Sequence, residues 1–181
     1  MIIIDNFLDS YDELKRYSLS CRFEDVANPV DGVIYPNICT EIPKRVQDEI
    51  LSKINTDSFY MFLRMSPRGV RVPHIAHTDN SMGDSSLMLY LNDGVGGTSL
   101  LRHKLTGCCY APEDPGFAEI LSHDVNNQDS WAVTDSVDMV QNRALIFDAH
   151  RFHRADPVFG FGSDQSNSRI VLTCFYDKSG D

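Results

Sequence analysis

Three residues, His77, Asp79 and His153, are of the types and spacing that could hold a metal ion together. In a β-strand, residues two apart point to the same face, so the His77 imidazole and the Asp79 carboxylate would project side by side. A histidine from another strand would complete a face of two histidines and one carboxylate. Such a face occupies three positions of an octahedron and leaves three open. A surface turn is the alternative interpretation of the H-x-D tripeptide.

Other histidines either compete for the third position or have a different explanation. His150 lies three residues before the third candidate ligand and is the main alternative to it. His74 lies an odd number of positions before the H-x-D pair, so in a continuous strand it would face away and serve a structural role. His103 and His123 have no spacing partner, which is typical of surface or loop residues.

The bulk properties describe a globular protein. The 181 residues are enough to bury a core as one domain, and the net charge of −10 argues against general binding to nucleic acid or to an anionic membrane. Five cysteines without disulfide or zinc-ligand spacing are typical of a reducing compartment. The apolar start is followed at once by Asp5 and is too short for a signal peptide or a membrane span. We therefore predict a cytoplasmic protein.

The first third of the chain predicts a helical support for whatever follows. Ser10 and Glu13 could form a capping box, and Pro43 suits the first turn of a helix. Several prolines and a glycine between the two helices predict a loop with at most one extended piece. The expected elements are a strand over 2–4, a helix over 10–19, a loop over 28–43 and a helix over 43–54.

The rest of the chain predicts short strands. Leucines occupy one face of 85–92 while mixed residues, Tyr90 among them, occupy the other, which indicates an apolar face under the helices and a face lining a cavity. Residues 106–135 show little periodicity apart from a short helix near 117–121, so we expect few apolar contacts there. Helices followed by many strands favour a helix-backed β-sandwich or barrel. The strands are expected over 59–65, 70–79, 85–92, 98–104, 144–148 and 169–176.

Six short motifs follow one another along the chain: H-T-D at 77–79, Y-L-N at 90–92, G-G-T at 96–98, F-D at 147–148, H-R-A-D-P-V at 153–158 and R-I-V-L at 169–172. In this order they resemble the Fe(II)- and 2-oxoglutarate-dependent dioxygenases, specifically the prolyl-4-hydroxylase-like branch. The similarity covers a core of about 59–176, and residues 1–58 resemble that branch's N-terminal helical support. Residues 1–181 are then expected to form a single domain.

The resemblance implies a mainly β fold, a double-stranded β-helix or jelly roll with N-terminal supporting helices. It also favours His153 over His150, because the family's ligand stands just ahead of an x-x-x-Pro-Val stretch. Arg169 would bind the far carboxylate of 2-oxoglutarate, and Tyr90 would share that carboxylate. The metal ligands implied are His77, Asp79 and His153.

The chemistry of Arg169 agrees with that role. A planar guanidinium matches a carboxylate with two parallel hydrogen bonds, and a buried arginine without a ligand would be a costly unpaired charge. A salt-bridged arginine at the start of a surface strand is the alternative. Residues 160–168 make the connection from His153 longer than the family's usual turn. Arg143, before the penultimate expected strand, is therefore the second candidate.

The resemblance implies an enzyme, a hydroxylase that decarboxylates 2-oxoglutarate to succinate, with demethylation as another outcome of the same chemistry. Fe(II) and 2-oxoglutarate are the expected cofactor and cosubstrate, with ascorbate as a further cofactor to consider. Two other classes stay open: a cupin-like metalloprotein of non-oxidative function, which would need a fourth ligand, and a non-catalytic jelly-roll binding module.

The substrate is open among a protein side chain, an amino acid, a nucleobase and a small metabolite. Arg64, Arg68 and Arg71 could form a basic rim, but we interpret them as a solvated, salt-bridged face. By the family's topology, residues 106–135 would lie near the cavity mouth, and we predict that they form a mobile lid that governs substrate choice.

Overall fold

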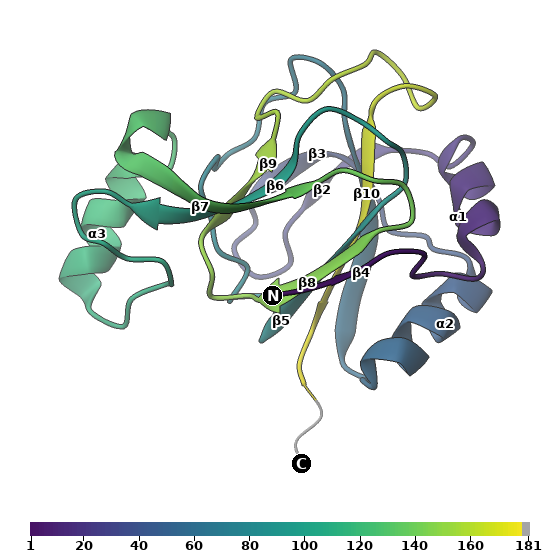
Figure 1. Ribbon diagram of the computed structural model, residues 1–181, viewed down its shortest axis with the longest axis horizontal. Coiled ribbons are helices and arrows are strands. Elements are labelled where there is room, and N and C mark those ends of the chain that lie inside the picture. The colour runs from purple at the N-terminus through teal and green to yellow at the C-terminus, as the bar shows by residue number, and fades with distance from the viewer. Residues whose placement is uncertain (179–181) are drawn as a thin grey trace.

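The computed structural model describes residues 1–178, which fold into two antiparallel sheets with helices beside them (Figure 1). Within these residues no helix has the length and apolar character needed to cross a membrane. In chain order the elements are β1 (Ile2–Ile4), α1 (Tyr11–Ser18), β2 (Glu24–Ala27), β3 (Ile34–Cys39), α2 (Lys44–Ile54), β4 (Phe59–Ser66), β5 (Ser85–Tyr90), β6 (Gly97–His103), α3 (Pro115–Asp124), a 3-10 turn (Gln128–Ser130), β7 (Trp131–Asp138), β8 (Ala144–Asp148), β9 (His153–Asp156) and β10 (Arg169–Tyr176).

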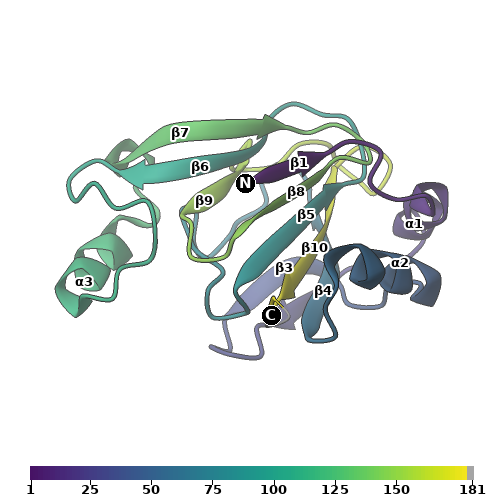
Figure 2. The ribbon, with the colours of Figure 1, turned by 60° about the horizontal axis from the view of Figure 1, so that its bottom comes forward.

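The two sheets form the layers of a sandwich. The larger sheet has the strand order β1-β8-β5-β10-β4-β3-β2, and the smaller has the order β7-β6-β9. Figure 2 shows the smaller sheet lying over one face of the larger one. Strand β10 lies between β5 and β4, and every one of its residues is buried. Its β-branched and aromatic residues suit a central strand covered on both faces.

Alternation along the strands separates two hydrophobic layers. The leucines of β5 and its continuation, Leu87, Leu89 and Leu91, pack in one cluster with helix residues such as Leu14 of α1 and Ile50 of α2. The opposite face contributes to a second cluster between the sheets, with Tyr90, Leu145, Phe147 and Val171 from the large sheet and Leu100 and Val137 from the small one. The predicted apolar outer face and mixed inner face are therefore confirmed.

The region predicted over 28–43 as a loop with at most one extended piece contains one strand, β3, between irregular segments, in agreement with the prediction. Strand β2, which precedes this region and forms a hairpin with β3, was not predicted. Strand β3 pairs with β2 on one side and with β4 on the other. Pro36 lies where the register of β2 and β3 shifts between Glu24 and Val26. Such an irregularity is one of the few places where a strand tolerates proline. The hairpin extends the large sheet, and its β2 end forms one wall of a cavity described below.

Two other strand predictions were incomplete. Residues 70–79 do not form a strand, and His77 makes only an isolated bridge. Strands β7 and β9 were not predicted, because β9 is short and β7 has a mixed sequence whose residues are mostly exposed. The remaining expected strands are present within a few residues of the predicted bounds.

Residues 106–135 are packed rather than loosely attached. Leu121 of α3 is 3% exposed and lies in a third hydrophobic cluster with Ala76, Leu101, Trp131 and Phe152. His103, predicted to be a surface or loop residue, is fully buried, and its Nε2 lies 2.9 Å from Asp124 Oδ2 at the end of α3. The expectation of few apolar contacts for 106–135 was therefore wrong.

Helix α1 begins in a different way from the one predicted. Ser10 makes no side-chain capping hydrogen bond, so the capping box with Glu13 is absent. Instead, Glu49 of α2 accepts hydrogen bonds from the backbone N–H groups of Asp9 at 2.6 Å and Ser10 at 3.0 Å, and from Ser10 Oγ at 2.5 Å. A carboxylate from the second helix thus stabilises the start of the first.

Candidate metal centre and adjoining cavities

Backbone pairing brings two histidines together from distant parts of the chain. The His77 N–H donates to the His153 carbonyl at 3.1 Å, and the His153 N–H donates to the His77 carbonyl at 2.9 Å. Asp79 is held separately, because its N–H donates to the Ala149 carbonyl at 2.8 Å. His153 begins β9 of the small sheet, while Ala149 directly follows β8 of the large one. The three side chains therefore meet where the two sheets come together.

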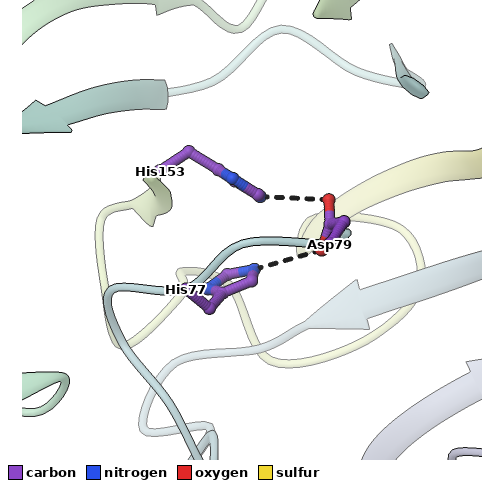
Figure 3. Close-up of side chains that lie close together, drawn as sticks. All are labelled: His77, Asp79 and His153. Carbon is purple, nitrogen blue, oxygen red and sulfur yellow. Dashed lines mark ion pairs between the residues drawn. The ribbon is translucent and has the colours of Figure 1, made fainter. Parts of the chain in front are cut away.

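The three side chains form one compact group. One ligand atom from each of His77, Asp79 and His153 lies within 4.8 Å of the others. His77 Nε2 is 3.8 Å from Asp79 Oδ1, and His153 Nε2 is 3.3 Å from Asp79 Oδ2. Figure 3 shows both imidazoles turned towards the carboxylate. The His77 side chain is 26% exposed and the His153 side chain 1%, so the group opens to solvent on one side.

Hydrogen bonds orient each of the three side chains. His77 Nδ1 lies 3.1 Å from the Ile75 carbonyl, and His153 Nδ1 lies 3.0 Å from the Arg151 carbonyl. A carbonyl only accepts, so each Nδ1 carries a proton, and in the neutral ring each Nε2 keeps a lone pair. Ser86 Oγ donates to Asp79 Oδ2 at 2.8 Å. Burial, followed by the nearby His153, lowers the pKa of His77 to about 4, so this imidazole is neutral at pH 7.

The group fits a metal ion. His153 Nε2 is buried and has no hydrogen-bond partner, although a buried polar atom is normally paired. Metal-binding imidazoles commonly donate their other ring N–H to a carbonyl, as both histidines do here. Two imidazole nitrogens and one carboxylate oxygen on one side of an ion suit Fe(II) with open positions. Within residues 1–178 the group has no fourth histidine, cysteine or carboxylate member.

The other histidines lie outside this group. His150 is exposed, and its Nδ1 is 3.1 Å from Asp148 Oδ1. His123 is exposed on α3, in agreement with the prediction. His74 lines both cavities beside the metal group, so the expectation that it faces away was wrong. That expectation assumed a continuous strand over 70–79, which the chain does not form.

Arg169 lies at the start of β10 with its side chain inside the molecule. The residue is 4% exposed, its Nη2 donates to the Gly97 carbonyl at 3.2 Å, and its Nε has no partner. Its guanidinium lies 6.0 Å from the centre of the Tyr90 ring. Burial lowers the pKa of Arg169. The Tyr90 hydroxyl donates to Thr98 Oγ1 at 2.8 Å, so Thr98 of the G-G-T motif lies at this end of the site.

The two glycines of the G-G-T motif allow strand β6 of the small sheet to approach Arg169 closely. A Cβ on Gly97 would lie 1.9 Å from the Val137 carbonyl oxygen, and a Cβ on Gly96 would lie 2.3 Å from the Asp156 carbonyl oxygen. Both glycines also have positive φ angles, which other residues rarely adopt. Only glycine therefore allows β6 to pass this closely and to present the Gly97 carbonyl to Arg169.

The long connection before β10 does not displace Arg169. Residues 157–168 pack on the turn after β4, where Gly69 N–H donates to the Phe159 carbonyl at 2.7 Å. Arg169 then pairs with Ser66 in regular register. Arg143, the second candidate, instead makes two hydrogen bonds to Asp5, at 2.6 and 3.1 Å. It lines neither of the two cavities at the metal group.

Two cavities adjoin the metal group. The larger, of about 160 Å³, is bounded by His77 and Asp79 and by parts of the β2–β3 hairpin, β4, β5 and β10. The smaller, of about 40 Å³, reaches from His77 to Arg169. Neither is lined by residues 106–135.

Arg64 lines both cavities, and we had interpreted it as part of a solvated, salt-bridged face. That interpretation was wrong, because its Nε and Nη2 are buried and have no hydrogen-bond partner. Burial, and then the charge of Arg169, lowers the pKa of Arg64 to about 10, so the guanidinium is still charged at pH 7. The missed signal was its position in β4, where alternation from Tyr60 and Phe62 places it on the inner face.

The fold and the group at its centre define a class: a double-stranded β-helix with a candidate face of two histidines and one carboxylate. Among solved structures, the chain is similar to a prolyl hydroxylase from Trichoplax adhaerens, crystallised with a hypoxia inducible factor oxygen degradation domain peptide fragment. The TM-score is 0.60 at 16% identity, over 98% of this chain and 83% of that chain. This likeness confirms the predicted jelly-roll fold.

Two further solved structures are similar at lower TM-scores. A prolyl-4-hydroxylase from Pseudomonas putida matches with TM-score 0.48 at 15% identity, over 96% of this chain and 90% of that chain. EvdO2 from Micromonospora carbonacea var. aurantiaca matches with TM-score 0.48 at 14% identity, over 95% of this chain and 84% of that chain. No family model and no curated protein sequence matches the chain.

Proposed function

We propose that the protein is an Fe(II)- and 2-oxoglutarate-dependent oxygenase that hydroxylates a substrate held in the larger cavity. The proposal depends on one observation: the candidate metal group and a buried arginine adjoin the same cavity. A three-residue metal face with a partnerless buried Nε2 lies at one side, and a buried arginine with a partnerless Nε lies at the end of the adjoining cavity. A metal ion and a carboxylate would satisfy the two together.

In this proposal His77, Asp79 and His153 hold the metal. When bound, Fe(II) in such a face supplies open coordination positions and a redox centre for reaction with dioxygen. The carbonyls of Ile75 and Arg151 keep the imidazoles in the ligating tautomer, and Ser86 holds one carboxylate oxygen of Asp79. Held this way, the ligands need little reorganisation when the ion binds.

Arg169 would bind the far carboxylate of 2-oxoglutarate, and the Tyr90–Thr98 pair would line the same end of the cosubstrate. The overall reaction takes up 2-oxoglutarate, dioxygen and a C–H bond, and releases succinate, carbon dioxide and the hydroxylated product. Apolar side chains such as Phe62 and Phe175 line the larger cavity, and a bound substrate packed against them would keep water from the reacting atoms. We further propose that the enzyme works in the cytoplasm, where its free cysteines would stay reduced, and that ascorbate serves as a reductant.

The test measures binding and turnover separately. Binding of Mn(II), and then of 2-oxoglutarate, is titrated without oxygen by thermal shift, and succinate release is measured with Fe(II) and oxygen across candidate substrates. His153→Ala should lose metal binding and succinate release, whereas the exposed His150→Ala should keep both. Retention by the first variant together with loss by the second would show that the third ligand is wrong. Metal binding by the wild type without any binding of 2-oxoglutarate would favour a cupin-like, non-oxidative metalloprotein instead.

A further inference from the structure

Arg64 is a second arginine with buried guanidinium nitrogens, Nε and Nη2, and the role of Arg169 does not explain it. It lies in the middle of β4 and pairs in register with Val171 of β10, so its side chain shares the inner face with Val171 and Arg169. It lines the larger cavity together with His77 and Asp79, and also the smaller one. Its guanidinium lies over the ring of Tyr35, with 5.5 Å to the ring centre.

The charge of Arg64 has no counter-charge in direct contact. Among the described residues it forms no ion pair, and its Nε and Nη2 have no hydrogen-bond partner. Of the carboxylates lining the larger cavity, Asp79 belongs to the metal group and Asp31 lies on the loop of the β2–β3 hairpin. A buried, unpaired charge strongly destabilises a fold, which points to an anion that arrives with a ligand.

The shape of the unsatisfied edge indicates which anion. Nε–H and one N–H of Nη2 point the same way from one side of the guanidinium, and this edge matches the two oxygens of a carboxylate. The cavity lining is mixed, and it includes an apolar part with Phe62, Met88 and Phe175. Its volume of about 160 Å³ is small beside the roughly 300–1,000 Å³ typical of drug-sized ligands.

We propose that the primary substrate is a small amphipathic carboxylic acid, whose carboxylate binds the Nε/Nη2 edge of Arg64 while its apolar part lies on the aromatic wall. This inference rests on the proposed function, because it assigns the larger cavity to the primary substrate. 2-Oxoglutarate accounts for one arginine only, since its near carboxylate would lie at the metal and its far carboxylate at Arg169. The carboxylate could belong to a free acid or to the C-terminus of a peptide.

The experiment compares acids with their own amides. The probes are hydrocinnamate, L-leucine and the tripeptide Gly-Gly-Leu, each tested against its primary amide by anaerobic thermal shift and calorimetry. Titrations are made with Mn(II), both with and without 2-oxoglutarate. The variant is Arg64→Met, which keeps an unbranched side chain as far as the position of Nε and removes the charged guanidinium. The matched control is Arg68→Met, because Arg68 is exposed on the turn that follows the same strand.

The expected result is that at least one acid binds the wild type about tenfold or more tightly than its amide. Arg64→Met should abolish this preference and Arg68→Met should retain it, while both variants keep the wild-type affinity for 2-oxoglutarate. The tripeptide pair separates a chain terminus from a free acid, and the same dependence on Arg64 in either case supports the proposal.

Three results would overturn it: equal binding of every acid and its amide, no binding of any acid, or a loss of 2-oxoglutarate affinity in Arg64→Met. The last result would assign Arg64 to the cosubstrate. Failure of the wild type to bind Mn(II) or 2-oxoglutarate would instead contradict the proposed function, and it is measured before any acid is added. The titrations without 2-oxoglutarate keep the two failures distinguishable.

Discussion

At the scale of one residue, Arg169 is a buried cation that the protein stabilises only in part. Its guanidinium has the Gly97 carbonyl as a protein acceptor, lies near the Tyr90 ring and leaves Nε without a partner. A carbonyl and an aromatic face stabilise a cation only partly. Arg169 lines the smaller cavity, and a carboxylate bound there could accept the hydrogen bond that Nε–H does not make within the protein.

Arg169→Met should raise the Michaelis constant for 2-oxoglutarate about tenfold or more, because a hydrogen bond to a charged group contributes about 1.5–3 kcal/mol. Steady-state succinate release at varied 2-oxoglutarate concentration measures the effect. Arg143→Met is the control, since Arg143 pairs with Asp5 and lines neither cavity. An unchanged Michaelis constant in Arg169→Met would remove Arg169 from the cosubstrate site.

Sequence reasoning at this scale selected residues that a motif or a spacing marks. The structure brings three of them, His77, Asp79 and His153, into one candidate metal group, and it buries Arg169. Arg64 was missed because its burial depends on neighbours far away in the sequence, Tyr35 in β3 and Val171 in β10. Strand alternation places Arg64 on the inner face, but it does not identify these long-range partners.

At the scale of elements, the start of α1 depends on a residue of α2. Burial tends to raise the pKa of Glu49, but the hydrogen bonds from Ser10 and Asp9 outweigh it and lower the pKa below its usual value. A carboxyl whose pKa is depressed by folding contributes stability above its unfolded pKa and loses that contribution as the pH falls through its folded pKa.

Glu49→Gln should therefore reduce the free energy of unfolding at pH 7 by about 1–2 kcal/mol. The difference from the wild type should shrink as the pH falls from about 5 to about 3, where the wild-type carboxyl becomes protonated. Urea denaturation across this range measures both effects. Asp48→Asn, at an exposed pair with Lys44, should change stability by less than about 0.5 kcal/mol. A difference that grows on acidification would contradict this account of the cap.

Tertiary pairing decides where an extended segment becomes a strand. Pairing with both β2 and β4 holds the one extended piece expected within 28–43 in strand β3, despite its proline. The opposite happened at 70–79, where extended residues lack a partner strand and form only the bridge at His77. The clear alternation in β5 was read correctly, because both of its faces are buried against different layers.

At the scale of the whole molecule, α3 and the end of β6 support the metal group from behind. The third hydrophobic cluster contains Ala76 and Phe152, the residues just before His77 and His153. The Ala76 N–H also donates to the Val125 carbonyl at 2.8 Å, just after α3. This packing is the kind that supports a site, whereas a lid should contact the cavity mouth.

Leu121→Ala should reduce the free energy of unfolding by about 2–4 kcal/mol, because it removes a buried side chain from that cluster. It should also weaken Mn(II) binding, which thermal shift and titration would measure. Phe117→Ala, 44% exposed on the same helix, is the matched control and should change neither quantity. If Leu121→Ala leaves stability and metal binding intact but uncouples 2-oxoglutarate consumption from hydroxylation, 106–135 is a lid after all.

The candidate metal ligands come from both sides of the sandwich. His153 begins β9 in the small sheet, whereas Asp79 is tied to Ala149 and to Ser86 of the large one. A bound ion would therefore cross-link the two layers, and separating them would require a ligand to dissociate first. Amide protons of β6 and β9 should then exchange with solvent more slowly when Mn(II) is bound than after chelation, while those of β4 and β10 change little. Metal supply would in this way regulate the lifetime of the protein in the cell as well as its chemistry.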